Sequence, residues 1–339
     1  MSPNLKSVTL VGVLGLLCAP LRAAHTGLTK DQVRFGYISQ GTRTGPLLIR
    51  LEMKVRFSIL REDRKDTEKL YALLTRTYNA STRSPDFDLL KERRLSNEAF
   101  SHFTQEKTGQ IYTIFSGGGS FRAKVVGGSI GSDYSDRRET SVSKNDLAAD
   151  AENGELFRLF LTLEPLDTPT IAVTSNQRIR VAGLKGVWTG HDTELFEPES
   201  APLDAHSTTA LKKELGSRFE QYNLNMFRSK SRTAIALKSA QSEEFAPGLY
   251  LTDGIKLIRA IAPMTRKVSG AGANANVLTP LFSFNVGDDL FLYVKDFGAT
   301  ECCVGEDTVA WHLLRYDRAS GRFVAVDRTD LALCTSNFI

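Results

Sequence analysis

The amino-acid sequence predicts an α+β protein made predominantly of antiparallel β-meander sheets, with two or three packed helices, after an N-terminal signal peptide. Three observations predict this fold class. Many short segments alternate apolar and polar residues with a period of two, which is typical of strands with one buried face. Turns that contain glycine and aspartate separate several of these segments, as in antiparallel hairpins. The sequence also lacks the repeated strand–helix–strand order that indicates a parallel sheet.

The first 23 residues have the features of a secretory signal peptide. Lys6 supplies a positive charge, and an uncharged apolar run extends from Val8 to Ala19. This run is shorter than the roughly 20 residues that span a bilayer, so it fits the apolar core of a signal peptide cleaved near Ala23. We therefore expect a secreted or periplasmic protein with no transmembrane span in the mature chain. A buried N-terminal helix or a lipidated Cys18 would be the alternatives.

The N-terminal part of the mature chain divides into a flexible lead-in at residues 24–46 and an α+β half at residues 47–196. A period of two predicts the strands of this half, and a period of 3.6 predicts its helices. The expected strands are 47–60, 99–105, 110–116, 120–126, 170–175 and 178–183, and residues 156–164 fit either a strand or a short helix. The expected helices are 66–78 and 84–94, and the polar residues 131–153 are expected to form a long loop.

A linker rich in proline and acidic residues at 197–206 precedes the C-terminal half at 207–339. An apolar stripe with helical spacing predicts one helix over residues 207–226. The stripe consists of Leu211, Leu215, Phe219, Tyr222 and Met226. A strand at 233–239 follows, and then three hairpins that turn at residues 253–254, 287–289 and 319–321.

The order of these elements resembles that of bacterial lipoprotein carriers, in which a curved antiparallel sheet cups a lipid tail over short helices. The resemblance rests on element order, and no sequence motif accompanies it. It implies an exported, non-enzymatic protein that binds an apolar ligand.

Composition and charge indicate a globular protein and argue against nucleic-acid binding. The chain has 339 residues, of which 41% are hydrophobic and 24% are charged. Removal of the signal peptide deletes Lys6 and Arg22 and no acidic residue, so the net charge falls from +4 to +2. A nucleic-acid-binding protein would show clustered basic residues. Here charges of both signs are interspersed, as in residues 61–69.

Three cysteines remain in the mature chain, Cys302, Cys303 and Cys334. In an oxidising compartment we expect one disulfide between Cys334 and either Cys302 or Cys303, with one thiol left over. A disulfide between the adjacent Cys302 and Cys303 would be strained and easily reduced, and would suit a redox switch. The spacing of cysteines and histidines does not match a zinc site, and no metal or cofactor is expected.

Residues 127–131 read Gly-Gly-Ser-Ile-Gly and match the G-x-S-x-G pattern of serine hydrolases. In those enzymes a strand delivers the serine to a sharp turn, and a helix begins directly after it. A predicted strand precedes Ser129, but residues 133–141 are too polar to form a buried helix. We therefore interpret the segment as a glycine-rich turn. If Ser129 were catalytic, His191 would be the first choice as its base.

Three functions are compatible with the sequence. The leading hypothesis is an exported, non-enzymatic β-rich protein that binds an apolar ligand, such as a lipid, or a protein partner. The alternatives are a secreted serine hydrolase that uses Ser129 and a structural or cell-surface interaction module. Trp188, Trp311 and Tyr316 are interpreted as core or hairpin residues, although a carbohydrate or lipid groove would use the same rings.

Overall fold

The structure of the protein is a computed structural model. It describes residues 28–40, 47–52, 93–104, 106–132, 157–169, 171, 178–239, 248–261, 277–299 and 307–331. The predicted signal peptide, the predicted helix at 66–78, most of the helix predicted at 84–94 and the three mature cysteines lie outside the described residues.

The N-terminal strands form a closed six-stranded antiparallel barrel. The hydrogen-bonded order is β5, β4, β7, β1, β2 and β6, and β6 pairs again with β5 to close the ring. The barrel strands are β1 (Val33–Gln40), β2 (Leu47–Glu52), β4 (Ile111–Ser116), β5 (Gly119–Ser132), β6 (Phe157–Pro165) and β7 (Ile179–Lys185). A short strand, β3 (Arg93–Arg94), pairs with the C-terminal end of β5. The length of β5 permits closure, because its first part pairs with β4 and its second part with β6.

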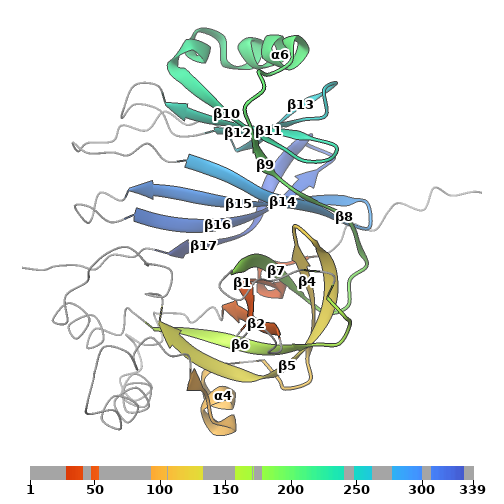
Figure 1. Cartoon of the computed structure of the whole chain (residues 1–339), viewed down its shortest axis with the longest axis vertical. Coiled ribbons are helices and arrows are strands. Elements are labelled where there is room, and N and C mark those ends of the chain that lie inside the picture. The colour runs from red at the N-terminus through yellow and green to blue at the C-terminus, as the bar shows by residue number, and fades with distance from the viewer. Residues whose placement is uncertain are drawn as a thin grey trace, which may run out of the picture.

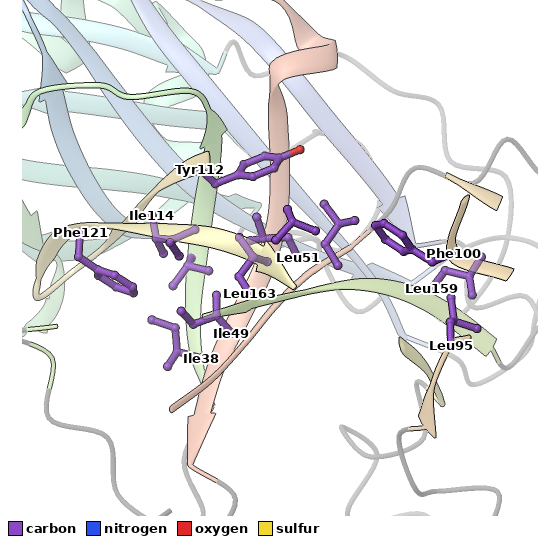
Figure 2. Close-up of a cluster of buried hydrophobic side chains, with 14 residues drawn as sticks. Ile38, Ile49, Leu51, Leu95, Phe100, Tyr112, Ile114, Phe121, Leu159 and Leu163 are labelled. Atoms are coloured by element: carbon purple, nitrogen blue, oxygen red, sulfur yellow. The ribbon is translucent and has the colours of Figure 1, made fainter. Parts of the chain in front are cut away.

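Apolar side chains fill the inside of the barrel. Alternate residues of each strand point inward, as in other small barrels. Figure 2 shows 14 buried side chains that converge between the strands, among them Ile49, Leu51 and Leu163. The helix α4 (Asn97–Phe103) adds Phe100 to this cluster. The barrel interior is therefore a packed core.

The remaining described strands form two five-stranded sheets. The central sheet has the order β17-β16-β15-β14-β8, and the outer sheet has the order β13-β12-β11-β10-β9. The central sheet consists of β8 (Gly190–Leu195), β14 (Val277–Val286), β15 (Asp289–Ala299), β16 (Asp307–Asp317) and β17 (Arg322–Leu331). The outer sheet consists of β9 (Glu197–Glu199), β10 (Tyr222–Arg228), β11 (Thr233–Ser239), β12 (Gly248–Thr252) and β13 (Leu257–Ile261). All pairings between the described strands are antiparallel.

The sheets, the barrel and one helix are stacked in layers (Figure 1). The helix α6 (Ala205–Leu215) covers the outer sheet, the outer sheet packs on the central sheet, and the central sheet packs on the barrel wall. On β15, Leu292 and Val294 contribute to the core shared with the outer sheet, whereas Phe291 and Tyr293 contribute to the core shared with the barrel. The central sheet is therefore buried on both faces.

One continuous segment crosses from the central sheet to the outer sheet. It contains the edge strand β8, the buried residue Phe196 and the edge strand β9. The predicted linker at 197–206 thus begins with β9 and ends within the first turn of α6. Because β8 pairs with β14, the central sheet combines strands from both predicted halves.

The three hairpin predictions are confirmed. Strands β12 and β13, β14 and β15, and β16 and β17 pair across the predicted turns. Gly254, Gly287 and Gly321 have positive φ in these turns, a backbone conformation that glycine adopts at little steric cost. The segment that fits either a strand or a helix forms β6.

Two predictions in the N-terminal half are wrong. Residues 33–40 of the predicted lead-in form β1, whose Val33 and Ile38 are fully buried in two different cores. Residues 97–103 form α4, whereas the apolar pattern predicts a strand from residue 99. Short apolar segments of this kind fit both the strand period of two and the helix period of 3.6. The packing of Phe100 into the barrel core favours the helix.

Two of the predicted helices differ from the structure where the chain is described. Residues 93–94, at the end of one predicted helix, form β3. The helix predicted over 207–226 ends at Leu215, where the 3-10 helix η3 (Gly216–Gln221) follows, and Tyr222 begins β10. Gly216 ends the α-helix with a φ of 59°, as glycine commonly does. Among the described residues only α6 exceeds two turns, and neither α-helix has the length and apolar character needed to cross a bilayer.

Candidate functional site

Ser129 lies within a strand and not at a turn. It belongs to β5, which continues beyond it, and it pairs with Phe160 of β6. The prediction of a glycine-rich turn at residues 127–131 is therefore wrong. Gly127 instead lies at a β-bulge, with a φ of 155°. A bulge places an extra residue in one strand of a pair, and glycine tolerates the backbone angles that result.

The environment of Ser129 differs from that of a serine on a nucleophile elbow. Ser129 is 2% exposed, and its Oγ accepts a hydrogen bond of 3.4 Å from the Oγ1 of Thr162. His191 lies on β8 of the central sheet, where it is exposed to solvent. The catalytic roles of Ser129 and His191 stay predictions. A fluorophosphonate probe that labels the native chain and not a Ser129→Ala variant would support them.

The two acidic residues near His191 have separate structural partners. Asp192 accepts a hydrogen bond of 3.3 Å from Asn285, and Glu194 accepts hydrogen bonds from Ser229 and Ser231. Within the described part of the chain, no group of three or more histidine, cysteine, aspartate and glutamate side chains could hold a metal ion. The disulfide predicted for Cys302, Cys303 and Cys334 falls outside the described residues and stays a prediction.

All three aromatic residues singled out in the sequence pack as core or hairpin residues, as expected. Trp188 packs against the core between barrel and central sheet, and its indole N–H donates to the Lys185 carbonyl at 2.9 Å. Tyr316 packs against Phe323 across the β16–β17 hairpin, with ring centroids 5.4 Å apart. Trp311 is buried in the core between barrel and central sheet, and polar side chains lie next to its ring.

Aromatic rings line the contact between the barrel and the central sheet. Phe115 of β4 stacks on Phe284 of β14, with centroids 4.2 Å apart. Phe282 of the same strand stacks on Tyr293 of β15 at 4.9 Å. Tyr293 in turn stacks on Trp311 of β16, at 5.9 Å and an interplanar angle of 18°. This row of rings crosses the central sheet from β14 to β16.

Charged side chains surround the Trp311 end of the row. The guanidinium of Arg180 on β7 lies 4.4 Å from the Trp311 ring centroid and 5.9 Å from that of Tyr37 on β1. The Lys295 Nζ lies 5.9 Å from the Trp311 ring, and the Arg178 guanidinium lies 4.5 Å from the Tyr37 ring. Such cation–π contacts each contribute about 0.5–2 kcal/mol. We call the junction cluster the following residues: Tyr37, Glu52, Arg178, Arg180, Tyr293, Lys295 and Trp311.

The junction cluster contains two buried hydrogen-bond donors that lack an acceptor among the described residues. Tyr293 is 0% exposed and Trp311 is 4% exposed. Neither the Tyr293 hydroxyl nor the Trp311 Nε1 has a hydrogen-bond partner among the residues that the structure describes. A buried polar group left unpaired costs about 1–3 kcal/mol, and native proteins usually satisfy such groups with an ordered water or a ligand.

The electrostatics place Arg180 and Glu52 close to the Tyr293 hydroxyl. Burial raises the pKa of Tyr293 above its ordinary value, the charge of Arg180 opposes this rise, and the charge of Glu52 adds to it. The phenol is therefore protonated at neutral pH and available as a donor. The Glu52 carboxylate lies 3.9 Å from Arg180, which is longer than a hydrogen bond.

A second buried polar cluster holds one end of the barrel together. The Glu106 carboxylate accepts hydrogen bonds of 2.9 Å from Arg34 of β1 and from Tyr112 of β4, and it lies 3.0 Å from the Nζ of Lys185 on β7. Burial raises the pKa of Tyr112, although the charge of Arg34 lowers it, so the phenol stays protonated as a donor to Glu106. Because these groups are partners of one another, we interpret this cluster as structural.

In comparisons with known proteins, no family model, curated protein or solved structure matches this chain. The function must therefore be inferred from the junction cluster itself. Sequence reasoning singled out Trp311 and missed its neighbours. The signal that could have found Arg178 and Arg180 is their spacing of two on a predicted strand, which places both side chains on one face.

Proposed function

We propose that this protein is an exported, non-enzymatic binding protein and that it binds a small ligand at the junction cluster. The observation that carries the proposal is the pair of buried donors, the Tyr293 hydroxyl and the Trp311 indole N–H, which lack acceptors among the described residues. The cluster supplies rings, cations and donors, which recognise a ligand by contact.

The packing of the barrel argues against a ligand in its interior. The order of elements in the sequence predicts a curved sheet that cups an apolar ligand, but 14 buried side chains occupy the space between the barrel strands (Figure 2). A lipid would have to displace these side chains, and tightly packed cores tolerate added volume poorly. We therefore place the ligand at the contact between barrel and central sheet.

Native mass spectrometry of the purified full chain tests this proposal. The folded protein is expected to carry a mass in excess of the polypeptide, and denaturation should release it. The excess should fall in a Trp311→Phe variant, which removes the indole donor and keeps an aromatic ring. Glu164→Gln, at an exposed ion pair on the barrel surface, is the matched control. A native mass equal to that of the polypeptide, or an excess that Trp311→Phe leaves intact, would contradict the proposal.

A further inference from the structure

We infer that Asp253 is a modification site, at which the bond between Asp253 and Gly254 isomerises to an isoaspartyl link, and that docking of α6 holds this site closed. The site lies in the β12–β13 turn of the outer sheet, apart from the ligand proposed at the junction cluster. Three observations carry this inference: an exposed Asp-Gly pair, the hydrogen bonds that hold both of its residues, and two contacts between the turn and α6.

The Asp-Gly pair has the chemistry that this reaction needs. The backbone nitrogen of Gly254 attacks the side-chain carboxyl carbon of Asp253, a C–N bond forms, and the amide proton leaves with the carboxyl OH as water. Water then adds to the main-chain carbonyl of the five-membered imide and breaks its bond to nitrogen, so the peptide link runs through the side chain. Glycine permits the backbone rotation that the attack requires, because it has no Cβ.

The turn presents the reacting groups to solvent. Asp253 and Gly254 are exposed, and the next residue, Ile255, is 83% exposed. A Cβ added at Gly254 would find no heavy atom within 4 Å among its described surroundings. Water is the co-reactant and reaches the turn, and the surrounding side chains leave room for the imide ring. Protection of the folded chain must therefore come from hydrogen bonds.

Hydrogen bonds hold both reacting groups in an unreactive arrangement. The Asp253 carboxylate accepts bonds from the backbone N–H of Lys256 at 2.8 Å and of Ile255 at 3.0 Å, as aspartate side chains often do in turns. These two bonds lower the pKa of Asp253. The carboxyl group is therefore ionised at neutral pH and lacks the OH that leaves in the reaction. The Gly254 N–H donates to the Thr252 Oγ1 at 3.0 Å, which holds the proton that must also leave.

Two side chains of α6 fasten this arrangement. The Ser207 Oγ lies 3.1 Å from the Thr252 Oγ1, and the His206 Nε2 lies 3.0 Å from the carbonyl oxygen of Ile255. Ser207 and Thr252 are 1% and 3% exposed, so the hydroxyl that accepts the Gly254 N–H is fixed while the helix is docked. Local openings of this kind need less free energy than global unfolding. Detachment of the first turn of α6 should therefore open the site.

The rate of isoaspartate formation at Asp253 tests the inference. The purified full chain is incubated at neutral pH, once folded and once unfolded in guanidinium chloride. It is then digested with endoproteinase Asp-N, which cleaves before aspartate and leaves isoaspartate uncut, so mass spectrometry of the peptides measures the isomerised fraction. The folded chain should isomerise at least about tenfold more slowly than the unfolded chain, because three hydrogen bonds hold the reacting groups. Equal rates, or an unfolded chain that stays unmodified at Asp253, would overturn the inference.

Variants test the part played by α6. Ser207→Ala removes the hydroxyl that holds Thr252, and Thr252→Val removes the acceptor of the Gly254 N–H and keeps the shape of the side chain. Each should raise the rate in the folded chain about two- to tenfold, the factor that corresponds to one hydrogen bond. Thr209→Ala, at an exposed position of the same helix, is the matched control and should leave the rate unchanged. If Thr252→Val fails to fold, Ser207→Ala provides the test.

A second control separates local opening at α6 from global unfolding. Gly36→Ala overpacks two strands of the barrel and leaves the contacts of α6 in place, so it should not change the rate at Asp253 in the folded chain. A rate that rises as much with Gly36→Ala as with Ser207→Ala would overturn the role of α6, because the site would then open by global unfolding. A rate that both Ser207→Ala and Thr252→Val leave unchanged would overturn it as well.

Discussion

Gly36 shows how closely two strands of the barrel approach each other. It pairs with Leu51 of β2, and a Cβ added at Gly36 would lie 1.9 Å from the carbonyl oxygen of Arg50. That oxygen belongs to the backbone, so a side-chain rotation cannot relieve the clash. Any residue larger than glycine must therefore move β1 away from β2 and disturb the wall that carries Tyr37.

A Gly36→Ala substitution is expected to lower the free energy of unfolding by about 3 kcal/mol, because it overpacks the strand pair. Gly118→Ala is the matched control, since a Cβ there would meet Ile171 at 3.4 Å, an ordinary contact. Gly118→Ala should lower the free energy of unfolding by less than about 1 kcal/mol. Urea denaturation of both variants measures the difference. Equal effects would show that the strands adjust freely at Gly36.

At the scale of elements, a single carboxylate ties the edge strand β8 to the β10–β11 turn of the outer sheet. Glu194 accepts hydrogen bonds from the Ser231 hydroxyl at 2.6 Å and from the Ser231 backbone N–H at 3.1 Å, and it also accepts one from the Ser229 hydroxyl. Burial by itself would raise the pKa of Glu194, but these hydrogen bonds and the charge of Arg232 outweigh it and lower the pKa below 4.5.

This contact predicts a pH-dependent contribution to stability. A carboxylate whose pKa is lowered by folding stabilises the protein above its unfolded pKa of about 4.5 and loses this contribution as the pH falls through the folded value. Glu194→Gln should therefore cost about 1–3 kcal/mol at pH 7, and the difference from the native chain should shrink below pH 4.5. Thermal denaturation between pH 3 and pH 7 tests this, with Lys230→Ala in the same turn as the control. A pH-independent difference would show that the charge of Glu194 is unimportant.

At the scale of the whole molecule, closure of the barrel depends on contacts between residues far apart in the chain. The Glu106 cluster joins β1, β4 and β7 at one end, where Arg34 and Lys185 converge on one carboxylate. The same three strands form the barrel wall that packs on the central sheet through Phe35, Phe115 and Leu184. Loss of Glu106 should therefore weaken both the barrel and the layer above it.

Glu106→Ala is expected to destabilise the protein by about 3–5 kcal/mol, because it leaves two cations partly buried without their acid. Glu164→Ala removes an acid from an exposed ion pair with Lys124 of the same barrel, and should cost less than about 1 kcal/mol. Chemical denaturation compares the two variants. If both variants lower the free energy of unfolding by the same amount, the Glu106 cluster does not stabilise the barrel.

The correct predictions concern features that neighbouring residues determine. The hairpin turns at Gly254, Gly287 and Gly321 were predictable because positive φ and tight turns are local requirements that glycine meets. The strands that flank these turns were predictable from the alternation of apolar and polar residues. The errors arose where a local pattern fits two structures, as in α4, or where the stripe through Tyr222 and Met226 continues past a glycine that ends the helix.

The sequence by itself determined that this protein is mostly antiparallel β-structure, because side-chain alternation and turn chemistry are encoded within a few residues of each other. Tertiary structure alone decided that six of the strands close into a barrel, since closure depends on the pairing of β5 with β6 and of β1 with β7. Tertiary structure also determined which residues meet in the junction cluster. Tyr37, Arg180, Tyr293 and Trp311 come from four strands spread over more than half of the chain, and only the packing of barrel on sheet brings their rings, charges and donors together.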